Sequence, residues 1–258
     1  MSAPLDALSK VRGALPPSAR RAVRRATDPV LAPVGSVAGV RPEGGGAGLV
    51  GLTFDDGPDP EVTPAVLDAL AAGGATATFF VLVDRGRDHP DLVRRARAEG
   101  HEIGLHGPDH RRLTTLGRRE VLDGLRRARA DLEAIAGAEV RWFRPPFGSQ
   151  SPATYLAARR AGLVPVVWTA EGEDWVAQLP EQVAGTIMGR VRPGGMILLH
   201  DGLAGDPREP AAPDPLHDVR GEIVARVLEG LAAAGLRGVP VGELARAGRL
   251  HRTAWFRP

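Results

Sequence analysis

The sequence of 258 residues contains no cysteine. This absence excludes a disulfide-stabilised scaffold, a thiolate zinc site, an iron–sulfur cluster and a cysteine nucleophile. Lysine is almost absent as well, because Lys10 is the only one and arginine supplies the other basic side chains. With 33 basic against 31 acidic residues the formal net charge is only +2. A field this weak does not favour nucleic acid as a partner, so none is expected.

Long hydrophobic runs are also missing. No segment approaches the ~20 apolar residues that a membrane-spanning helix needs. Residues 1–41 contain no apolar run of seven or more residues, so the hydrophobic region of a secretory signal is not found there. We therefore expect a cytoplasmic protein. The basic segment 18–26 could rest on anionic lipid as a short helix, which makes peripheral membrane contact an alternative to a surface-draped extension.

Composition divides the chain into three parts. Residues 1–47 form a basic, proline-rich N-terminal extension that ends in a glycine-rich junction. Residues 48–247 carry the periodic segments of a folded domain, and residues 248–258 form a C-terminal tail. A domain of about 200 residues can bury a core without disulfides.

From residue 48 onward, short apolar runs alternate with longer amphipathic segments. Strands are expected at residues 49–54, 77–83, 101–105, 140–143, 164–168, 196–199 and 239–241. Helices are expected at residues 63–73, 90–99, 117–136, 151–160, 180–191, 219–234 and 242–247. This alternation predicts an α/β fold with a parallel sheet. About seven such units favour an incomplete or distorted barrel, with a doubly wound open sheet as the alternative.

Polar side chains follow the first and third predicted strands. Asp55 and Asp56 come directly after the first strand, and His106 and His110 follow the third. Because the carboxyl ends of parallel strands meet at one face, these residues are expected to converge. Two imidazoles and one carboxylate suit zinc or a similar divalent ion. Asp109 is an alternative oxygen ligand, although its side chain should point away from the face that His110 uses.

Three further clusters follow later strands. They are Arg144–Gly148, Glu171–Trp175 and the end of the segment Met196–Asp201. A single cluster of this kind is often a cap or a buried ion pair. Clusters at five successive strand ends indicate a shared functional site.

Five motifs give the sequence a specific resemblance. In chain order they are Thr53–Pro58, the His106-x3-His110 pair, Arg144–Gly148, Asp174-Trp175 and Leu198-x-His200. In this order they resemble the motifs of the polysaccharide deacetylases with a NodB homology domain, carbohydrate esterase family four. The resemblance extends over about residues 48–247. It implies a distorted (β/α)7 barrel and metal-dependent removal of N-acetyl, sometimes O-acetyl, groups from a sugar or glycan substrate.

The resemblance also implies a ligand set for the metal. Asp56, His106 and His110 would hold a divalent ion, with Zn2+ expected first and Co2+ or Ni2+ as alternatives. Such an ion polarises a carbonyl and lowers the pKa of bound water towards ~7.

Roles for four further polar residues follow from the same resemblance. Asp55 would be the general base and Arg144 would orient it. His200 would be the general acid and Asp174 its partner. An imidazole beside a carboxylate suits protonation of a departing amine near neutral pH.

The same resemblance implies the residues that contact the acetyl group. Trp175 and Leu198 would line the pocket for its methyl, and a backbone N–H beside Pro146 and Phe147 would help to hold the oxyanion. The long segment 202–217 is expected to form one wall of the acceptor site.

Departures from the family pattern bear on the substrate. Gly107 stands where Ser or Thr is usual, Leu105 where Asn is frequent, and Glu171 where Asp is common. These departures weaken an assignment to ordinary chitin or peptidoglycan. A deacylase of a lipid-linked amino sugar at the inner membrane face, or a catalytically silent glycan-binding barrel, are the alternatives.

Other hydrolase classes fit less well. No Gly-x-Ser-x-Gly motif occurs, which argues against a serine esterase. A glycosidase could use Asp55 with Glu171 or Asp174, but it would leave His106 and His110 without a function.

Overall fold

The computed structural model describes residues 35–42, 48–209 and 213–256. The basic segment 18–26, most of the N-terminal extension and residues 43–47 of the predicted junction lie outside these residues. Within the described part of the chain, no helix is long and apolar enough to cross a membrane.

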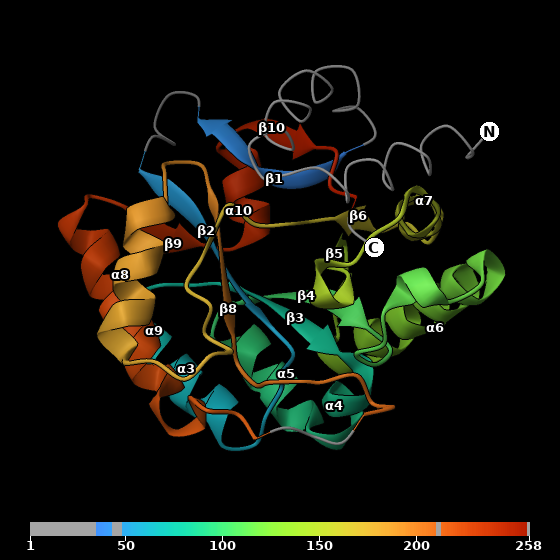
Figure 1. The fold of residues 1–258 in the computed structure, drawn as a ribbon, viewed down its shortest axis with the longest axis horizontal. Helices are drawn as coiled ribbons and strands as arrows, with labels where there is room; N and C mark the ends of the chain where they lie inside the picture. Colours follow the sequence, from blue (N-terminus) through green and yellow to red (C-terminus); the bar gives the residue numbers. More distant parts are fainter. Residues whose placement is uncertain (1–34, 43–47, 210–212, 257–258) are drawn as a thin grey trace.

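The centre of the molecule is a parallel sheet (Figure 1). Its strand order is β6-β5-β4-β3-β2-β8-β7, and β9 pairs with β2. The strands are β2 Leu49–Asp55, β3 Thr78–Leu82, β4 Glu102–Gly107, β5 Trp142–Phe143, β6 Val164–Pro165, β7 Ala170–Glu171, β8 Met196–His200 and β9 Arg237–Val239. The sheet is curled into a half-barrel whose ends are β6 and β7. The predicted distorted barrel is therefore confirmed.

Helices pack around the outer side of this sheet (Figure 1). They are α3 Val62–Ala72, α4 Val83–Asp88, α5 Pro90–Ala98, α6 Arg118–Ala136, α7 Pro152–Arg160, α8 Pro180–Arg190 and α9 Arg220–Ala233. Helix α10 Val241–Arg246 packs differently, because its Val241 and Leu244 belong to a separate buried cluster with Phe80 and Met196. Short 3-10 turns occupy Leu113–Thr115, Pro146–Gly148 and His217–Val219.

Helix ends follow the chemistry of the sequence. Ser151 caps α7 through a hydrogen bond from the Thr154 amide, and Gly137 ends α6 in the left-handed conformation, as such residues typically do. Helix α3 was expected to begin at residue 63 and begins at Val62. The Asp59 carboxylate accepts from the Val62 amide, and the Thr63 hydroxyl donates to Asp201.

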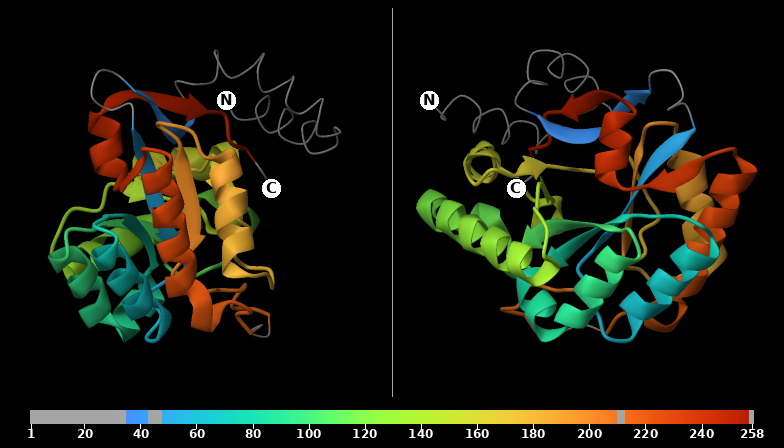
Figure 2. Two further views of the ribbon diagram at one scale, coloured as in Figure 1. Left: turned by 90° about the vertical axis from the view of Figure 1, so that its left-hand side faces the viewer. Right: turned by 180° about the vertical axis from the view of Figure 1, so that it is seen from behind.

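Strand β1 Ser36–Pro42 pairs antiparallel with β10 Gly248–Thr253. These two segments lie within the expected N-terminal extension, 1–47, and the expected C-terminal tail, 248–258. Val37 is buried and bridges to Val166, just beyond β6. Both views of Figure 2 place the β1–β10 ribbon beside α10, at one end of the molecule. This ribbon covers the part of the sheet around β6, where the half-barrel is open.

The core lies on both sides of β2. The side chains of Leu52 and Phe54 are fully buried against the helices, whereas Phe80, Trp142 and Met196 belong to a second cluster that includes Val37. Burial on both faces explains why β2 reads as an almost continuous apolar run. The run ends at Asp55, where the chain reaches the carboxyl edge of the sheet.

Candidate metal centre and catalytic site

Two consecutive aspartates stand at the carboxyl end of β2, and their side chains contact different partners. Asp55 is the last residue of the strand, and Asp56 adopts the left-handed conformation with φ 75°. Aspartate is among the few non-glycine residues that tolerate this region. The turn directs the Asp55 carboxylate to Arg144 and the Asp56 carboxylate to two histidines.

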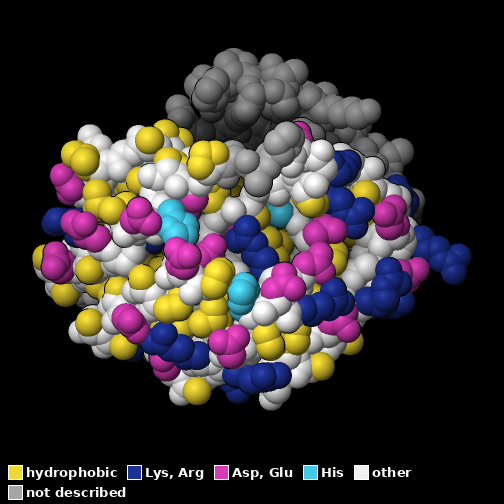
Figure 3. Space-filling model, turned by 90° about the horizontal axis from the view of Figure 1, so that it is seen from below, with side chains coloured by type: hydrophobic (Ala, Val, Ile, Leu, Met, Phe, Trp, Pro, Cys, Tyr) yellow, Lys and Arg dark blue, Asp and Glu magenta, His cyan; other side chains and the backbone are white. Residues whose placement is uncertain are grey.

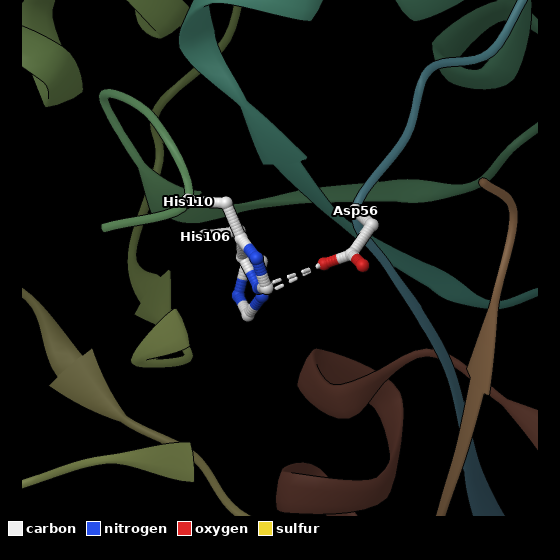
Figure 4. Close-up of side chains that lie close together, drawn as sticks. All are labelled: Asp56, His106 and His110. Atoms are coloured by element: carbon white, nitrogen blue, oxygen red, sulfur yellow. Dashed lines mark ion pairs between the residues drawn. The ribbon is translucent and has the colours of Figure 1, made fainter. Parts of the chain in front are cut away.

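Asp56, His106 and His110 converge on one point (Figure 4). The Asp56 Oδ1 atom lies 3.2 Å from the Nε2 atom of His106 and 3.2 Å from that of His110. All three side chains are buried. Two ligands that each lie about 2.1 Å from a tetrahedral zinc ion are about 3.4 Å apart, so these separations suit a shared ion.

Hydrogen bonds leave the three ligand atoms facing one another. The His106 Nδ1–H donates to the Arg144 carbonyl oxygen at 2.8 Å, which directs Nε2 towards Asp56. The Ala204 amide donates to Asp56 Oδ2 at 2.8 Å, so the second carboxylate oxygen is already engaged. Asp56 Oδ1 is buried without a hydrogen-bond donor. An orphaned buried oxygen between two imidazole nitrogens fits a cation-binding site.

The protonation states also favour a metal. Burial lowers the pKa of His110 to about 4, so its imidazole is neutral at pH 7 and can act as a ligand. Burial opposes ionisation of Asp56, but the neighbouring imidazoles of His106 and His110 hold its pKa well below the usual range. The alternative ligand Asp109 instead accepts a hydrogen bond from Arg111.

Asp55 lies beside this group and is held by a buried arginine. Arg144 Nη1 donates to Asp55 Oδ1 at 2.7 Å and to Thr53 Oγ1 at 2.8 Å. The Arg144 guanidinium is fully buried over the ring of Phe80, and burial lowers its pKa. Because Arg144 also supplies the carbonyl that orients His106, a single residue positions both a metal ligand and its acidic neighbour.

His200 ends β8 and is paired with Asp174. The His200 Nδ1–H donates to Asp174 Oδ1 at 2.8 Å, and the His200 amide donates to Asp174 Oδ2 at 2.9 Å. Burial opposes a charged imidazole, but the adjacent Asp174 carboxylate outweighs it and raises the pKa of His200 to about 9. The ring of Trp175 meets the His200 ring edge to face, with the ring centres 5.7 Å apart.

A cavity of about 400 Å³ joins these groups. It is lined by Asp55, Asp56, His106, His110, Arg112, Phe147, Gly148, Trp168, Glu171, Trp175, Leu198, His200, Leu203 and Ala204. Pro146 is buried and is not part of the lining. Among the large apolar side chains that line the cavity, Phe147 and Trp175 are the exposed ones, at 37% and 39%. Leu203 and Ala204 bring the segment after β8 to its wall.

Several residues that support the site were not predicted from the sequence. Arg85 donates to the backbone oxygens of Asp56 and Leu203, and thereby ties the cavity wall to a ligand. Asp201 accepts hydrogen bonds from the Gly57 amide and the Thr63 hydroxyl, and burial raises its pKa to about 7. No sequence motif predicts these contacts, because they join segments far apart in the chain.

The backbone conformation explains why residue 107 is a glycine. Its φ is 145°, and a Cβ atom there would lie 2.8 Å from the Asp109 carbonyl oxygen. A Ser or Thr would therefore strain the loop between the two histidine ligands. Although position 107 lacks the hydroxyl that is usual in the family pattern, the Arg144 carbonyl orients His106.

The surface opposite the β1–β10 ribbon carries mixed charge. Figure 3 shows acidic and basic side chains interspersed over this face, with histidines among them. No broad area of one sign is visible on this face.

The fold and this site define a metal-binding α/β hydrolase. Comparison with known proteins makes the class specific, since a model of the polysaccharide deacetylases matches residues 43–166. The chitooligosaccharide deacetylase of Sinorhizobium fredii is 42% identical over 164 residues, which cover 63% of this chain and 76% of that protein. A peptidoglycan-N-acetylglucosamine deacetylase of Bacillus cereus is 33% identical over 204 residues, covering 77% of this chain and 88% of that protein.

A solved structure shares the architecture. The family 4 carbohydrate esterase from Streptomyces lividans, in complex with acetate, superposes with a TM-score of 0.67 at 26% identity, over 80% of this chain and 98% of that one. The chain thus belongs to the polysaccharide deacetylase family, carbohydrate esterase family four. It is a metal-dependent carbohydrate de-N-acetylase, a hydrolase that acts on carbon–nitrogen bonds.

Proposed function

We propose that the chain removes the acetyl group from N-acetylglucosamine units of an oligosaccharide, releasing acetate and a free amino sugar. The observation that carries the proposal is the convergence of Asp56, His106 and His110 beside two further titratable side chains, Asp55 and His200. The names of the relatives support this substrate class, because they act on chitooligosaccharides or on peptidoglycan N-acetylglucosamine.

Asp56, His106 and His110 would hold the divalent ion, for which we propose Zn2+. When bound, such an ion polarises the amide carbonyl and makes water more acidic. Two imidazoles and one carboxylate would give such an ion three protein ligands, the number typical of catalytic zinc sites.

Asp55 is proposed as the general base. Its carboxylate lines the cavity next to the ligand group, and the hydrogen bond from Arg144 fixes its orientation. It would accept a proton from the water that attacks the carbonyl carbon. Arg144 would keep the Asp55 carboxylate in place without itself entering the cavity, since its side chain is fully buried.

His200 is proposed as the general acid. Its Nδ1 is engaged by Asp174, which leaves Nε2 to face the cavity that it lines. When the carbon–nitrogen bond breaks, the departing nitrogen takes the proton from Nε2 and leaves as an amine. The raised pKa of His200, about 9, keeps this nitrogen protonated at neutral pH.

The apolar part of the cavity suits an acetyl methyl and a sugar face. Leu198 and Trp175 lie beside His200 and would contact the methyl group. Phe147 contacts the tilted His110 ring and the Arg112 guanidinium, each 4.1 Å from its ring centre, and its exposed part would contact the pyranose ring. The backbone N–H of Phe147 is proposed to assist the oxyanion.

The test combines metal analysis with acetate release. Purified protein is assayed for bound metal and then for acetate released from N-acetylglucosamine oligomers, peptidoglycan fragments and a lipid-linked N-acetylated sugar. We expect about one divalent ion per chain and release from the soluble oligomers. Bound metal without release from any of these substrates would contradict the proposal and favour another acyl group or a binding function.

A further inference from the structure

Arg220 is a buried cation that neither the metal centre nor the cavity lining accounts for. It is the first residue of α9, directly after the segment 201–219 that follows β8. Its side chain is only 2% exposed. Buried guanidinium groups are costly unless they are fully paired, so its partners are informative.

Three of its hydrogen bonds go to the proposed acid pair. Arg220 Nη1 donates to Asp174 Oδ2 at 3.0 Å and to the His200 carbonyl oxygen at 3.1 Å. Arg220 Nη2 donates to the Asp174 carbonyl oxygen at 3.1 Å. Arg220 therefore contacts both the backbone and the carboxylate of the residue that orients His200.

The remaining hydrogen bonds go to Asp214 in the segment between β8 and α9. Arg220 Nε donates to Asp214 Oδ2 at 2.7 Å, and Nη2 donates to Asp214 Oδ1 at 2.9 Å. With the three bonds to Asp174 and His200, these bonds match the five N–H donors of a guanidinium. A lysine at this position could not reproduce this bidentate geometry.

The two carboxylate oxygens of Asp174 have different hydrogen-bond donors. Oδ2 accepts from Arg220 and from the His200 amide, so Oδ1 is left for the His200 imidazole. The charges alternate along the series His200, Asp174, Arg220, Asp214. Arg220 thus links Asp214, in the stretch before α9, to the acid pair.

We propose that Arg220 is a positioning residue, which with Asp214 holds the Asp174 carboxylate in the arrangement that aligns His200 for proton donation. The proposal rests on the proposed role of His200 as the general acid. It adds a second charged pair, Arg220 and Asp214, behind the Asp174–His200 pair.

The experiment uses the dependence of the reaction on its leaving group. Breaking the carbon–nitrogen bond of an N-acetyl sugar needs a proton on the departing nitrogen. Breaking the carbon–oxygen bond of 4-nitrophenyl acetate releases a stable phenolate that needs none. A defect in acid alignment should therefore slow the first substrate selectively, whereas general loosening of the site should slow both.

Arg220→Met is compared with the matched control Arg226→Met, which lies on the same helix and breaks an exposed pair with Glu222. We expect Arg220→Met to keep its metal and to lose about 10- to 100-fold in kcat on N-acetylglucosamine oligomers. Its loss on 4-nitrophenyl acetate should stay within about threefold. Arg226→Met should match the wild type on both. Equal losses on the two substrates, or no loss at all, would overturn the proposal.

A second variant and a spectroscopic measurement cover the remaining outcomes. Asp214→Asn keeps Arg220 but breaks the bidentate pair, and should show the same selective loss to a smaller extent if Arg220→Met does not fold. In protein labelled with 15N-histidine, the downfield Nδ1–H resonance that is absent in His200→Gln should weaken in Arg220→Met and Asp214→Asn but not in Arg226→Met. This signal is independent of turnover, so it tests the positioning even if the proposed N-acetyl substrate is wrong. An unchanged resonance in both variants would overturn the proposal.

Discussion

Asp55 and His200 occupy partnered positions on the neighbouring parallel strands β2 and β8. Side chains at partnered positions of parallel strands point to the same face. The two residues proposed as base and acid therefore flank one opening, and the metal ligand Asp56 follows directly after the first of them. The sheet itself fixes their separation, without help from a mobile loop.

Replacing Asp55 by Asn should separate metal binding from hydrolysis. An amide can still accept the hydrogen bond from Arg144, but it cannot take a proton from water. We expect Asp55→Asn to retain its metal and to lose at least about 100-fold in kcat, as measured by acetate release and metal analysis. The matched control is Asp109→Asn, whose carboxylate contacts Arg111 and which should keep both properties. Full activity of Asp55→Asn would show that the base is another group.

Replacing His106 by Ala should remove the metal itself. His106 supplies one of three ligand atoms, and two ligands alone hold a divalent ion weakly. We expect metal content below about a tenth of the wild-type value, measured by elemental analysis after dialysis. His217→Ala, which changes a partly exposed histidine at the start of the 3-10 turn before α9, serves as the control and should keep its metal. Normal metal content in His106→Ala would contradict the assigned ligand set.

The pH dependence should reveal the Asp174–His200 pair. His200 donates only while it is protonated, so kcat should fall as the pH rises through about 9. In Asp174→Asn the main favourable charge is removed, and this alkaline limb should move to lower pH. The stability of the folded state should depend on pH in the same direction. The raised pKa of His200 contributes its full stabilisation below pH ~6.5, and this contribution is lost as the pH passes about 9. Kinetics and thermal unfolding at several pH values measure the two effects, and an unmoved limb in Asp174→Asn would exclude His200 as the acid.

The backbone of Ala204 should affect metal affinity. Its N–H is bonded to Asp56 Oδ2, and a proline has no such donor. We expect Ala204→Pro to weaken metal binding about tenfold or more, measured by competition with a chelator. Ala204→Gly keeps the N–H and should stay close to the wild type. Equal affinities in the two variants would mean that this hydrogen bond does not support the ligand.

Leu199 should matter for stability and not for chemistry. It is 1% exposed on β8, next to His200 but on the opposite face of the strand. We expect Leu199→Ala to lower the free energy of unfolding by about 2–5 kcal/mol, measured by denaturant titration. Leu156→Ala, at a position that is 38% exposed, should cost less than about 1 kcal/mol. If Leu199→Ala also lowered the free energy of unfolding by less than about 1 kcal/mol, the assignment of Leu199 to the core would be wrong.

The order of strands and helices could be predicted from the sequence because glycines, prolines and a capping serine mark the ends of the periodic segments. Helix α6 was expected at 117–136 and spans Arg118–Ala136. The short strands β5 and β6 were expected to be longer, and β7 was not expected at all. Strand length in a curled sheet depends on the neighbouring strand, which a local pattern does not contain.

The residues at the metal centre were predictable because they stand at strand ends in recognisable motifs. Arg220 was not predictable, because an arginine near the start of a predicted helix is normally interpreted as a solvent-exposed charge. The Ala204 amide was not predictable either, since every non-proline residue has a backbone N–H. Side-chain type identifies the groups that perform chemistry, whereas the groups that hold them depend on contacts between distant segments.

The pairing of β1 with β10 joins residues about two hundred positions apart. During translation Val37 emerges early, whereas Arg252, its partner, is made about two hundred residues later. Until then this ribbon cannot form, and the apolar side chains of β1 lack their pairing with β10. The strand that completes the ribbon therefore becomes available only after all the described strands of the parallel sheet have been made.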